Sequence, residues 1–305
     1  MINTIQPVDL TKAIVQPLPD ETWSKNDVSV NVLRLDRIHP VLSGNKWFKL
    51  KYHLQQAIQQ NRKGLLTFGG AYSNHLVASA IACKLEGLAA IGIVRGEAVE
   101  QLSPTLREAQ DYGMQLQFVS RTIFSEEEQL IAAMQAQYPG ILVVPQGGQS
   151  EAGIQGAAEI LALTDYSAYT HIACAAGTGT MLAGLVKAAG PKQQVLGVSS
   201  LKIADRENNS LLSFVKEQTG LSNFSLLYDY HFGGYARKND TLLRFMNDLY
   251  NRHHLPTDFV YTAKLMYGIN DLIHNNYFPP GSRLLVIHSG GLQGNRSLAP
   301  GILSF

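Results

Sequence analysis

The stretch GLLTFGGAYSNHLVASAIACKLEGLAAIGIV, residues 64–94, decides the fold class of this chain. It begins with a short apolar run, 64–68, which is typical of a strand buried on both faces. A Gly-rich turn, a helical pattern over 74–85 and a second apolar run over 88–94 follow. Because two buried strands joined by a helix usually run parallel, this segment predicts a parallel β-sheet.

The same alternation continues along the chain on both sides of this segment. The further expected strands are 28–35, 115–119, 141–144, 171–174, 195–198 and 283–288, and the further expected helices are 46–60, 103–112, 126–137, 151–163 and 180–187. This rhythm predicts an α/β fold of doubly wound, mainly parallel sheets with helices on both faces.

A Gly- and Gln-rich segment, 145–150, separates two groups of predicted strands. We place one domain crossing there and the other within the helix that follows Lys46. We therefore predict a larger domain, residues 1–54 and 150–305, with a smaller α/β domain, residues 55–149, inserted in it. The cleft between the two domains is the expected ligand site.

Composition and charge exclude several classes of function. The formal net charge is +1, and no basic run is interleaved with aromatic residues, so we expect no nucleic-acid partner. No apolar run approaches the ~20 residues that cross a bilayer, so we expect no membrane association. Segment 1–20 carries three prolines and no continuous apolar core, which argues against a secretory signal and favours the cytoplasm.

The two cysteines, Cys83 and Cys174, each lie in an apolar stretch, where we expect buried, reduced thiols. The nine histidines form no helical pair at metal-ligand spacing, and no Cys/His spacing suits zinc. We expect no metal site.

Lys46 closes the string Ser43-Gly44-Asn45-Lys46, where a loop opens a predicted helix. A lysine forms a Schiff base readily when burial or a second cation lowers its pKa, and Lys49, one helical turn on, is a candidate for that cation. A solvated lysine at a helix start explains the same string. The motif by itself leaves both interpretations open.

The turn after the strand 64–68 is Gly69-Gly70-Ala71-Tyr72-Ser73-Asn74-His75. Ser73 or Asn74 can cap the next helix, which is a sufficient structural reason for either residue. Capping does not explain two glycines and a histidine at the carboxyl end of a strand, where open α/β sheets bind ligands.

A second Gly-rich turn, Ala175-Ala176-Gly177-Thr178-Gly179-Thr180, also joins a strand to a helix and suits a phosphate. A dinucleotide fingerprint would need a glycine where Leu182 stands and an acid at the end of the next strand, which ends in Ser199-Ser200. The Gly-Lys-Ser/Thr of a nucleotide-binding P-loop is also missing. A nucleotide cofactor is therefore disfavoured.

Two further segments have plain interpretations when taken alone. His288-Ser289-Gly290-Gly291 can be a turn after the last buried strand. The segment 259–264 can be the end of a strand and the start of a helix.

Taken together and in order, these motifs resemble the 1-aminocyclopropane-1-carboxylate deaminase/D-cysteine desulfhydrase family, which belongs to the tryptophan synthase β-like, or fold type II, pyridoxal phosphate enzymes. The motifs that carry the resemblance are Ser43-Gly44-Asn45-Lys46 with Lys49-Leu50, Ser73-Asn74-His75, Gly177-Thr178-Gly179-Thr180, Val260-Tyr261-Thr262 and His288-Ser289-Gly290-Gly291. The resemblance covers about residues 33–291, and its most specific part is Gly-Asn-Lys-x-x-Lys-Leu.

The resemblance implies a cofactor, pyridoxal 5'-phosphate, bound as a Schiff base to Lys46, which also moves the α-proton of the substrate. It places Lys49 and the N–H groups of Gly177, Thr178, Gly179 and Thr180 at the phosphate and Asn74 at the phenolic oxygen. Thr262 and Ser289 are candidate partners of the pyridine nitrogen. Ser73 would face the substrate carboxylate or act as an auxiliary proton-transfer group, and Tyr261 would cover the substrate side. It also implies that segment 229–235 borders the site and that the protein is a homodimer.

Thr262 is one of three departures from the family, and ring-opening members are expected to carry a glutamate there. Because a cyclopropane carbon is a poor leaving group, Thr262 favours β-elimination of a good leaving group, such as the thiol of D-cysteine. The other departures, Tyr72 and Trp47-Phe48, replace polar residues. The expected function is a lyase or deaminase that releases ammonia and a 2-oxo acid from a small amino acid. The alternatives are 1-aminocyclopropane-1-carboxylate deaminase and a non-catalytic homologue that binds the cofactor or an amino acid.

Overall fold

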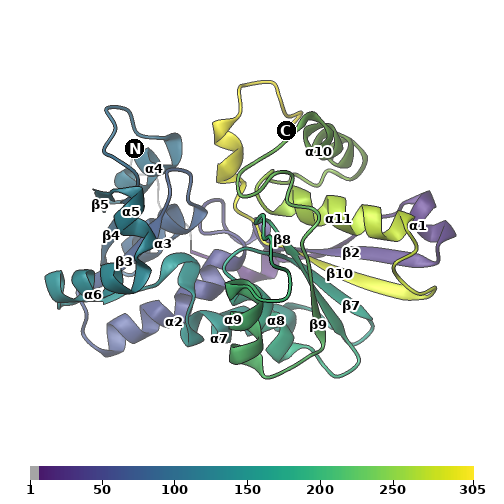
Figure 1. Ribbon diagram of the computed structural model, residues 1–305, viewed down its shortest axis with the longest axis horizontal. Coiled ribbons are helices and arrows are strands. Elements are labelled where there is room, and N and C mark those ends of the chain that lie inside the picture. The colour runs from purple at the N-terminus through teal and green to yellow at the C-terminus, as the bar shows by residue number, and fades with distance from the viewer. Residues whose placement is uncertain (1–6) are drawn as a thin grey trace.

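Two β-sheets, each in its own lobe, organise the protein (Figure 1). The structure is a computed structural model that describes residues 7–305; residues 1–6, which begin the predicted larger domain and the predicted N-terminal segment, lie outside the described residues. The larger sheet has the strand order β1-β2-β10-β7-β8-β9, and the smaller has the order β5-β4-β3-β6. Strands β3 to β6 lie between β2 and β7 in the sequence, which confirms a smaller parallel-sheet domain inserted in a larger one. The bounds 55–149 remain a prediction.

Neighbouring strands run parallel except for the edge pair β1 and β2. The strands are β1 (Val15–Pro17), β2 (Val28–Arg34), β3 (Gly64–Gly69), β4 (Ala89–Arg95), β5 (Met114–Val119), β6 (Ile141–Val143), β7 (His171–Ala176), β8 (Gln194–Ser199), β9 (Phe224–Leu227) and β10 (Ser282–His288). The helices are α1 (Glu21–Lys25), α2 (Asn45–Gln59), α3 (Asn74–Leu85), α4 (Pro104–Asp111), α5 (Arg121–Ser125), α6 (Glu127–Gln137), α7 (Glu151–Ala158), α8 (Thr180–Ala188), α9 (Ser210–Thr219), α10 (Asp240–His253) and α11 (Thr262–His274).

Strand β10 shows why the apolar runs form parallel strands buried on both faces. Leu284 and Val286 pack into the core beneath α11, whereas Leu285 and Ile287 pack into the core beneath α7 and α8. Side chains alternate between the faces of a strand, so only a continuous apolar run can satisfy both layers. The smaller sheet follows the same rule, with separate cores on its two faces.

Several elements differ from the sequence-based expectations. Strands β1 and β9 and helices α1, α5 and α9 were not predicted, and the predicted helix 151–163 is α7 followed by a 3-10 segment, Glu159–Leu163. Residues 259–261 form a turn instead of the predicted strand end. The physical reason is Asp258, whose carboxylate accepts hydrogen bonds from the backbone N–H groups of residues 260–262 and so replaces a strand partner.

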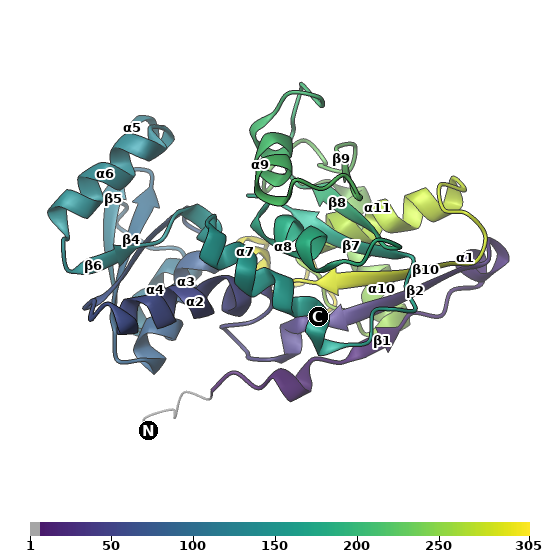
Figure 2. The ribbon, with the colours of Figure 1, turned by 90° about the horizontal axis from the view of Figure 1, so that it is seen from below.

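Helix α2 packs against α7 between the lobes (Figure 2). The carboxyl ends of β3, β7 and β10 lead to one common cavity, so turns distant in sequence meet there. Within residues 7–305, none of the helices combines the length and the apolar character needed to span a bilayer.

Candidate active site

A cavity of about 90 Å³ lies where turns of the two lobes meet. Its lining includes the first turns of α2 and α3, the carboxyl ends of β3 and β7, and the turn after β10. All predicted site residues except Thr180 and Thr262 line it: Lys46, Lys49, Ser73, Asn74, Gly177, Thr178, Gly179, Tyr261 and Ser289. The fold thus brings together motifs that are far apart in the chain.

Lys46 lies in the first turn of α2, next to the turn after β10. Gly44, the N-cap of α2, has a φ of +65°, and a Cβ there would lie 1.7 Å from the Ser289 carbonyl oxygen. Asn45 N–H donates to that carbonyl oxygen at 3.1 Å, and Lys46 Nζ donates to Asn45 Oδ1 at 2.9 Å. Glycine is therefore required for the close approach that places Lys46 in the cavity.

Burial lowers the pKa of Lys46 to about 8, although the negative charge of Asp258 opposes the shift. An amine with such a pKa is partly unprotonated near neutral pH, so it can act as a nucleophile or a base.

The cause that lowers the pKa of Lys46 is burial, and the charge of Lys49 is not among the effects on it. Burial, followed by the charge of Lys46, lowers the pKa of Lys49 well below its usual value. No carboxylate is among the described side chains that line the cavity, so an anion bound there would restore the charge of Lys49.

The start of α8 offers that anion a binding position. Gly179, its N-cap, has a φ of +87°, and no side chain caps the helix. The first N–H groups of α8 therefore have no side-chain acceptor, and the helix dipole adds a partial positive charge. Gln149 Nε2 holds the turn by donating to the Thr178 carbonyl oxygen at 3.0 Å, whereas the buried Thr180 hydroxyl contacts Thr178 Oγ1 at 3.0 Å.

Ser73 caps α3 and also lines the cavity, so its role as a helix cap does not exclude contact with a ligand. Its Oγ accepts a hydrogen bond from Leu76 N–H at 3.3 Å. Asn74 Nδ2 donates to the Gly291 carbonyl oxygen at 2.6 Å and keeps a second N–H for a ligand.

His75 contributes a neutral imidazole to the cavity. Thr67 Oγ1 donates to the Val144 carbonyl oxygen at 2.9 Å, so it can only accept from His75 Nε2, which lies 3.0 Å away. This assigns the proton to Nε2 and leaves Nδ1 buried without a partner among the described residues. Burial, with the charges of Lys46 and Lys49, lowers the pKa of His75 well below its usual value.

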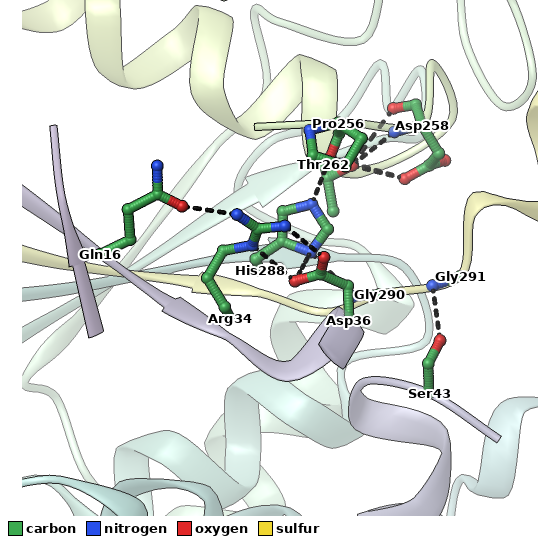
Figure 3. Close-up of polar contacts among 10 residues, drawn as sticks. All are labelled: Gln16, Arg34, Asp36, Ser43, Pro256, Asp258, Thr262, His288, Gly290 and Gly291. Atoms are coloured by element: carbon green, nitrogen blue, oxygen red, sulfur yellow. Dashed lines mark hydrogen bonds and ion pairs between the residues drawn. The ribbon is translucent and has the colours of Figure 1, made fainter. Parts of the chain in front are cut away.

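The two hydroxyls proposed for the pyridine nitrogen have different surroundings. Thr262 Oγ1 donates to Asp258 Oδ1 at 2.8 Å, accepts from Asp258 N–H at 2.7 Å and does not line the cavity (Figure 3). Ser289 lines the cavity, and its hydroxyl makes no hydrogen bond to another described residue. Of the two, Ser289 is the one free to bind a ligand.

Tyrosine rings form one side of the cavity. The ring centroid of Tyr261 lies 6.0 Å from Lys46 Nζ and 6.0 Å from the ring centroid of Tyr235. Burial, followed by the effect of Tyr235, raises the pKa of Tyr261 well above its usual value, so its phenol stays protonated. Lys264 Nζ donates to the Gly234 carbonyl oxygen at 2.8 Å and so holds the loop that carries Tyr235, a residue of the cavity lining.

Sequence patterns missed Asp258, which organises the turn beside the cavity. Its carboxylate is fully buried, and burial raises its pKa although three backbone N–H groups and the Thr262 hydroxyl bind it. An aspartate shortly before a helix start is a recognisable capping signal, and it could have been noticed. Gln146 and Gly147, expected only at a domain crossing, also line the cavity.

These residues fit pyridoxal phosphate. The uncapped α8 terminus and Lys49 suit its phosphate, the Lys46 amine suits its aldehyde, and the free Ser289 hydroxyl suits its ring nitrogen. The cavity has two lysines and no carboxylate among its described lining side chains, as an anionic cofactor requires.

Comparisons with known proteins agree with this fit. A family model described as pyridoxal-phosphate dependent enzyme matches residues 22–290. A protein of Pyrococcus horikoshii, provisionally named a 1-aminocyclopropane-1-carboxylate deaminase, is 27% identical over 278 residues, 86% of this chain and 84% of the relative. A D-cysteine desulfhydrase of Salmonella typhi is 26% identical over 282 residues, 85% of this chain and 86% of the relative.

A solved structure described as an ACC deaminase homologue has a TM-score of 0.80 and 25% sequence identity, and the match covers 96% of this chain and 94% of that chain. The likeness extends over both lobes, which confirms the fold type II architecture. The family match, the fold and the cavity agree, and we conclude that this chain belongs to the pyridoxal-phosphate dependent enzymes.

Proposed function

We propose that this protein eliminates the thiol of D-cysteine and releases hydrogen sulfide, ammonia and pyruvate with consumption of one water. The observation that carries the proposal is the environment of Thr262. Its hydroxyl is bound by Asp258, and no acid lines the cavity among the described residues. Ring opening is expected to need a glutamate at this position, and no other acid in the cavity lining takes its place. Elimination of a thiol needs no such acid.

The cavity also limits the substrate class. Lys46 and Lys49 are the basic side chains in its described lining and both are assigned to the cofactor, so a charged substrate side chain would have no partner of opposite charge left there. A small neutral side chain, such as that of cysteine, has no such cost. Relatives named as D-cysteine desulfhydrase and as 1-aminocyclopropane-1-carboxylate deaminase support this class of substrate.

Pyridoxal phosphate, when bound, supplies an electron sink for the bond that breaks at the substrate α-carbon. We assign the residues as follows. Lys46 binds the cofactor covalently and moves the α-proton, Lys49 and the N–H groups of residues 177–180 bind the phosphate, and Asn74 binds the phenolic oxygen. Ser73 contacts the substrate carboxylate or acts as an auxiliary proton-transfer group, and Tyr261 covers the substrate side. Ser289 contacts the ring nitrogen, whereas Thr262, the other candidate for that contact, is bound by Asp258.

Two measurements test this assignment. Borohydride reduction of the protein with bound cofactor should attach the cofactor to the peptide that contains Lys46. A screen of both enantiomers of cysteine and serine, with 1-aminocyclopropane-1-carboxylate, should give ammonia and 2-oxo acid fastest from D-cysteine. Label on another lysine would refute the role of Lys46. Faster turnover of the cyclopropane would assign the ring-opening activity, and no turnover of any amino acid would favour a binding protein.

We further propose a cytoplasmic homodimer. Cys83 and Cys174 are buried and unpaired, which suits a reducing compartment, and the dimer follows from the family resemblance. Light scattering should give about twice the chain mass of 33.4 kDa, and a monomeric mass would contradict the dimer.

A further inference from the structure

A network of buried, mostly charged side chains lies next to the turn that follows β10 (Figure 3). Arg34 forms two hydrogen bonds with Asp36, from Nε to Oδ1 at 2.8 Å and from Nη2 to Oδ2 at 2.6 Å, and Arg34 Nη1 also donates to Gln16 Oε1 at 2.5 Å. The same Asp36 Oδ1 lies 3.2 Å from His288 Nδ1. On the other side of its ring, His288 Nε2 lies 2.7 Å from the Pro256 carbonyl oxygen.

The two ring nitrogens of His288 contact different partners. The Pro256 carbonyl oxygen can only accept, so the proton on Nε2 is assigned. Nδ1 lies 3.2 Å from Asp36 Oδ1 and 3.3 Å from the backbone nitrogen of Gly290. The contact with the buried, charged carboxylate is the stronger of the two.

The side chains of this network are well shielded from water. The side-chain exposures are 8% for Arg34, 9% for Asp36 and 1% for His288. Burial by itself would raise the pKa of Asp36, but the charge of His288 and then the hydrogen bond of Arg34 outweigh it, so the pKa is lowered. Removal of one partner from such a group leaves a buried charge unpaired, which is costly.

The Asp36–His288 pair joins the same two segments that meet in the cavity. Asp36 precedes the loop that opens α2, and His288 directly precedes Ser289. Next to the cavity, Ser43 Oγ accepts from Gly291 N–H at 3.2 Å, and the Ser289 carbonyl oxygen accepts from Asn45 N–H at 3.1 Å. The charged pair therefore connects the two segments through residues that do not line the cavity.

We propose that Asp36, acting through His288, is a positioning residue for the reaction: it fixes the turn that carries Ser289 relative to the first turn of α2, which carries Lys46. The proposal rests on the roles proposed above for Lys46 and Ser289. No atom of Asp36 or His288 lines the cavity, so the effect on chemistry is indirect.

Two replacements of His288 separate its two contacts. The amide nitrogen of Asn can occupy about the position of Nδ1 and keep a donor for Asp36, whereas that of Gln reaches about the position of Nε2 and keeps only the contact with Pro256. We expect Asp36→Asn and His288→Gln to lower kcat about tenfold to a hundredfold with KM changed less than about twofold, and to shift the visible absorption band of the bound cofactor. His288→Asn should stay within about threefold of the wild-type kcat.

Asp20→Asn is the matched control, because Asp20 also pairs with an arginine, Arg252, and caps α1 away from the cavity. It should lower thermal stability and leave kcat and the absorption band unchanged. The double variant Asp36→Asn/His288→Gln should lose no more kcat than either single variant if Asp36 acts through His288.

A measurement without cofactor or substrate completes the test. Hydrogen exchange should accelerate at residues 288–294 and 43–50 in Asp36→Asn and His288→Gln, and not in the control. Unchanged exchange there, additive losses in the double variant, or a greater loss in His288→Asn than in His288→Gln would overturn the proposal. Failure of borohydride to label Lys46 would instead refute the proposed function, and the exchange result would still decide whether Asp36 positions the turn.

Discussion

Lys46 is kept in an environment that disfavours its charge. Its pKa of about 8 results from burial, and the negative charge of Asp258 does not fully offset that effect. A reactive amine near neutral pH is useful for covalent binding of an aldehyde, yet it destabilises the folded chain. The proposed role of Lys46 and the stability of the fold therefore conflict at this residue.

Replacement of Lys46 by Met should stabilise the cofactor-free protein at pH 7 by about 1–3 kcal/mol, because the buried amine no longer has to carry a proton. Since the pKa in the folded state is lowered, wild-type stability should rise between pH 8 and the usual lysine pKa, where only the unfolded chain keeps the proton. Urea unfolding at pH 7 and 9.5 measures this, and the gain of the variant should shrink at the higher pH. The exposed Lys84→Met is the control; an equal gain there would contradict the explanation.

At the scale of elements, α8 combines two properties that a phosphate site needs. The turn before it exposes backbone N–H groups, and no side chain caps its first residues. Gly179 makes this possible because it adopts a φ of +87°, and an added Cβ would lie 2.9 Å from side-chain atoms of Leu211 and Phe214. The geometry of the turn thus depends on one residue type.

Gly179→Ala should weaken binding of pyridoxal phosphate at least about tenfold, because the turn must shift to relieve strain and contact. Fluorescence titration of the cofactor-free protein measures this. Gly220→Ala is the matched control, since Gly220 has a φ of +63° at the end of α9 and an added Cβ would meet nothing within 4 Å. It should lose about 1 kcal/mol of stability and keep cofactor affinity. Equal affinity of both variants would remove α8 from the phosphate site.

At the scale of the whole molecule, the cavity joins the two lobes. Residues 68–75 come from the smaller sheet and its turn, whereas residues 175–179 and 289–290 come from the larger sheet. Any ligand that fills the cavity contacts both lobes at once. Cofactor binding should therefore couple their unfolding.

Saturating pyridoxal phosphate should stabilise the folded chain by at least about 2.7 kcal/mol at a concentration of 100 Kd, and the two lobes should then unfold in one transition. Calorimetry with and without the cofactor measures both effects. Pyridoxal without the phosphate should stabilise less, because it leaves α8 and Lys49 unpaired. Equal stabilisation by both compounds would mean that the phosphate does not bind where we propose.

Local patterns in the sequence were sufficient for the fold class and for most of the candidate residues that line the cavity. The alternation in residues 64–94 predicts parallel strands because period and length are properties of neighbouring residues. The glycines around 177–179 and the lysine at 46 likewise lie in turns whose place at strand ends and helix starts can be predicted from the chain. The cofactor came from resemblance to a family, and the family match confirms it.

Only the tertiary structure decided which of these groups are reactive. Burial, not Lys49, lowers the pKa of Lys46, and Asp258 binds the Thr262 hydroxyl while Ser289 stays free. The pair of Asp36 and His288 joins opposite ends of the chain. Desolvation and long-range contacts depend on what packs around a side chain in three dimensions, and no local pattern contains that information.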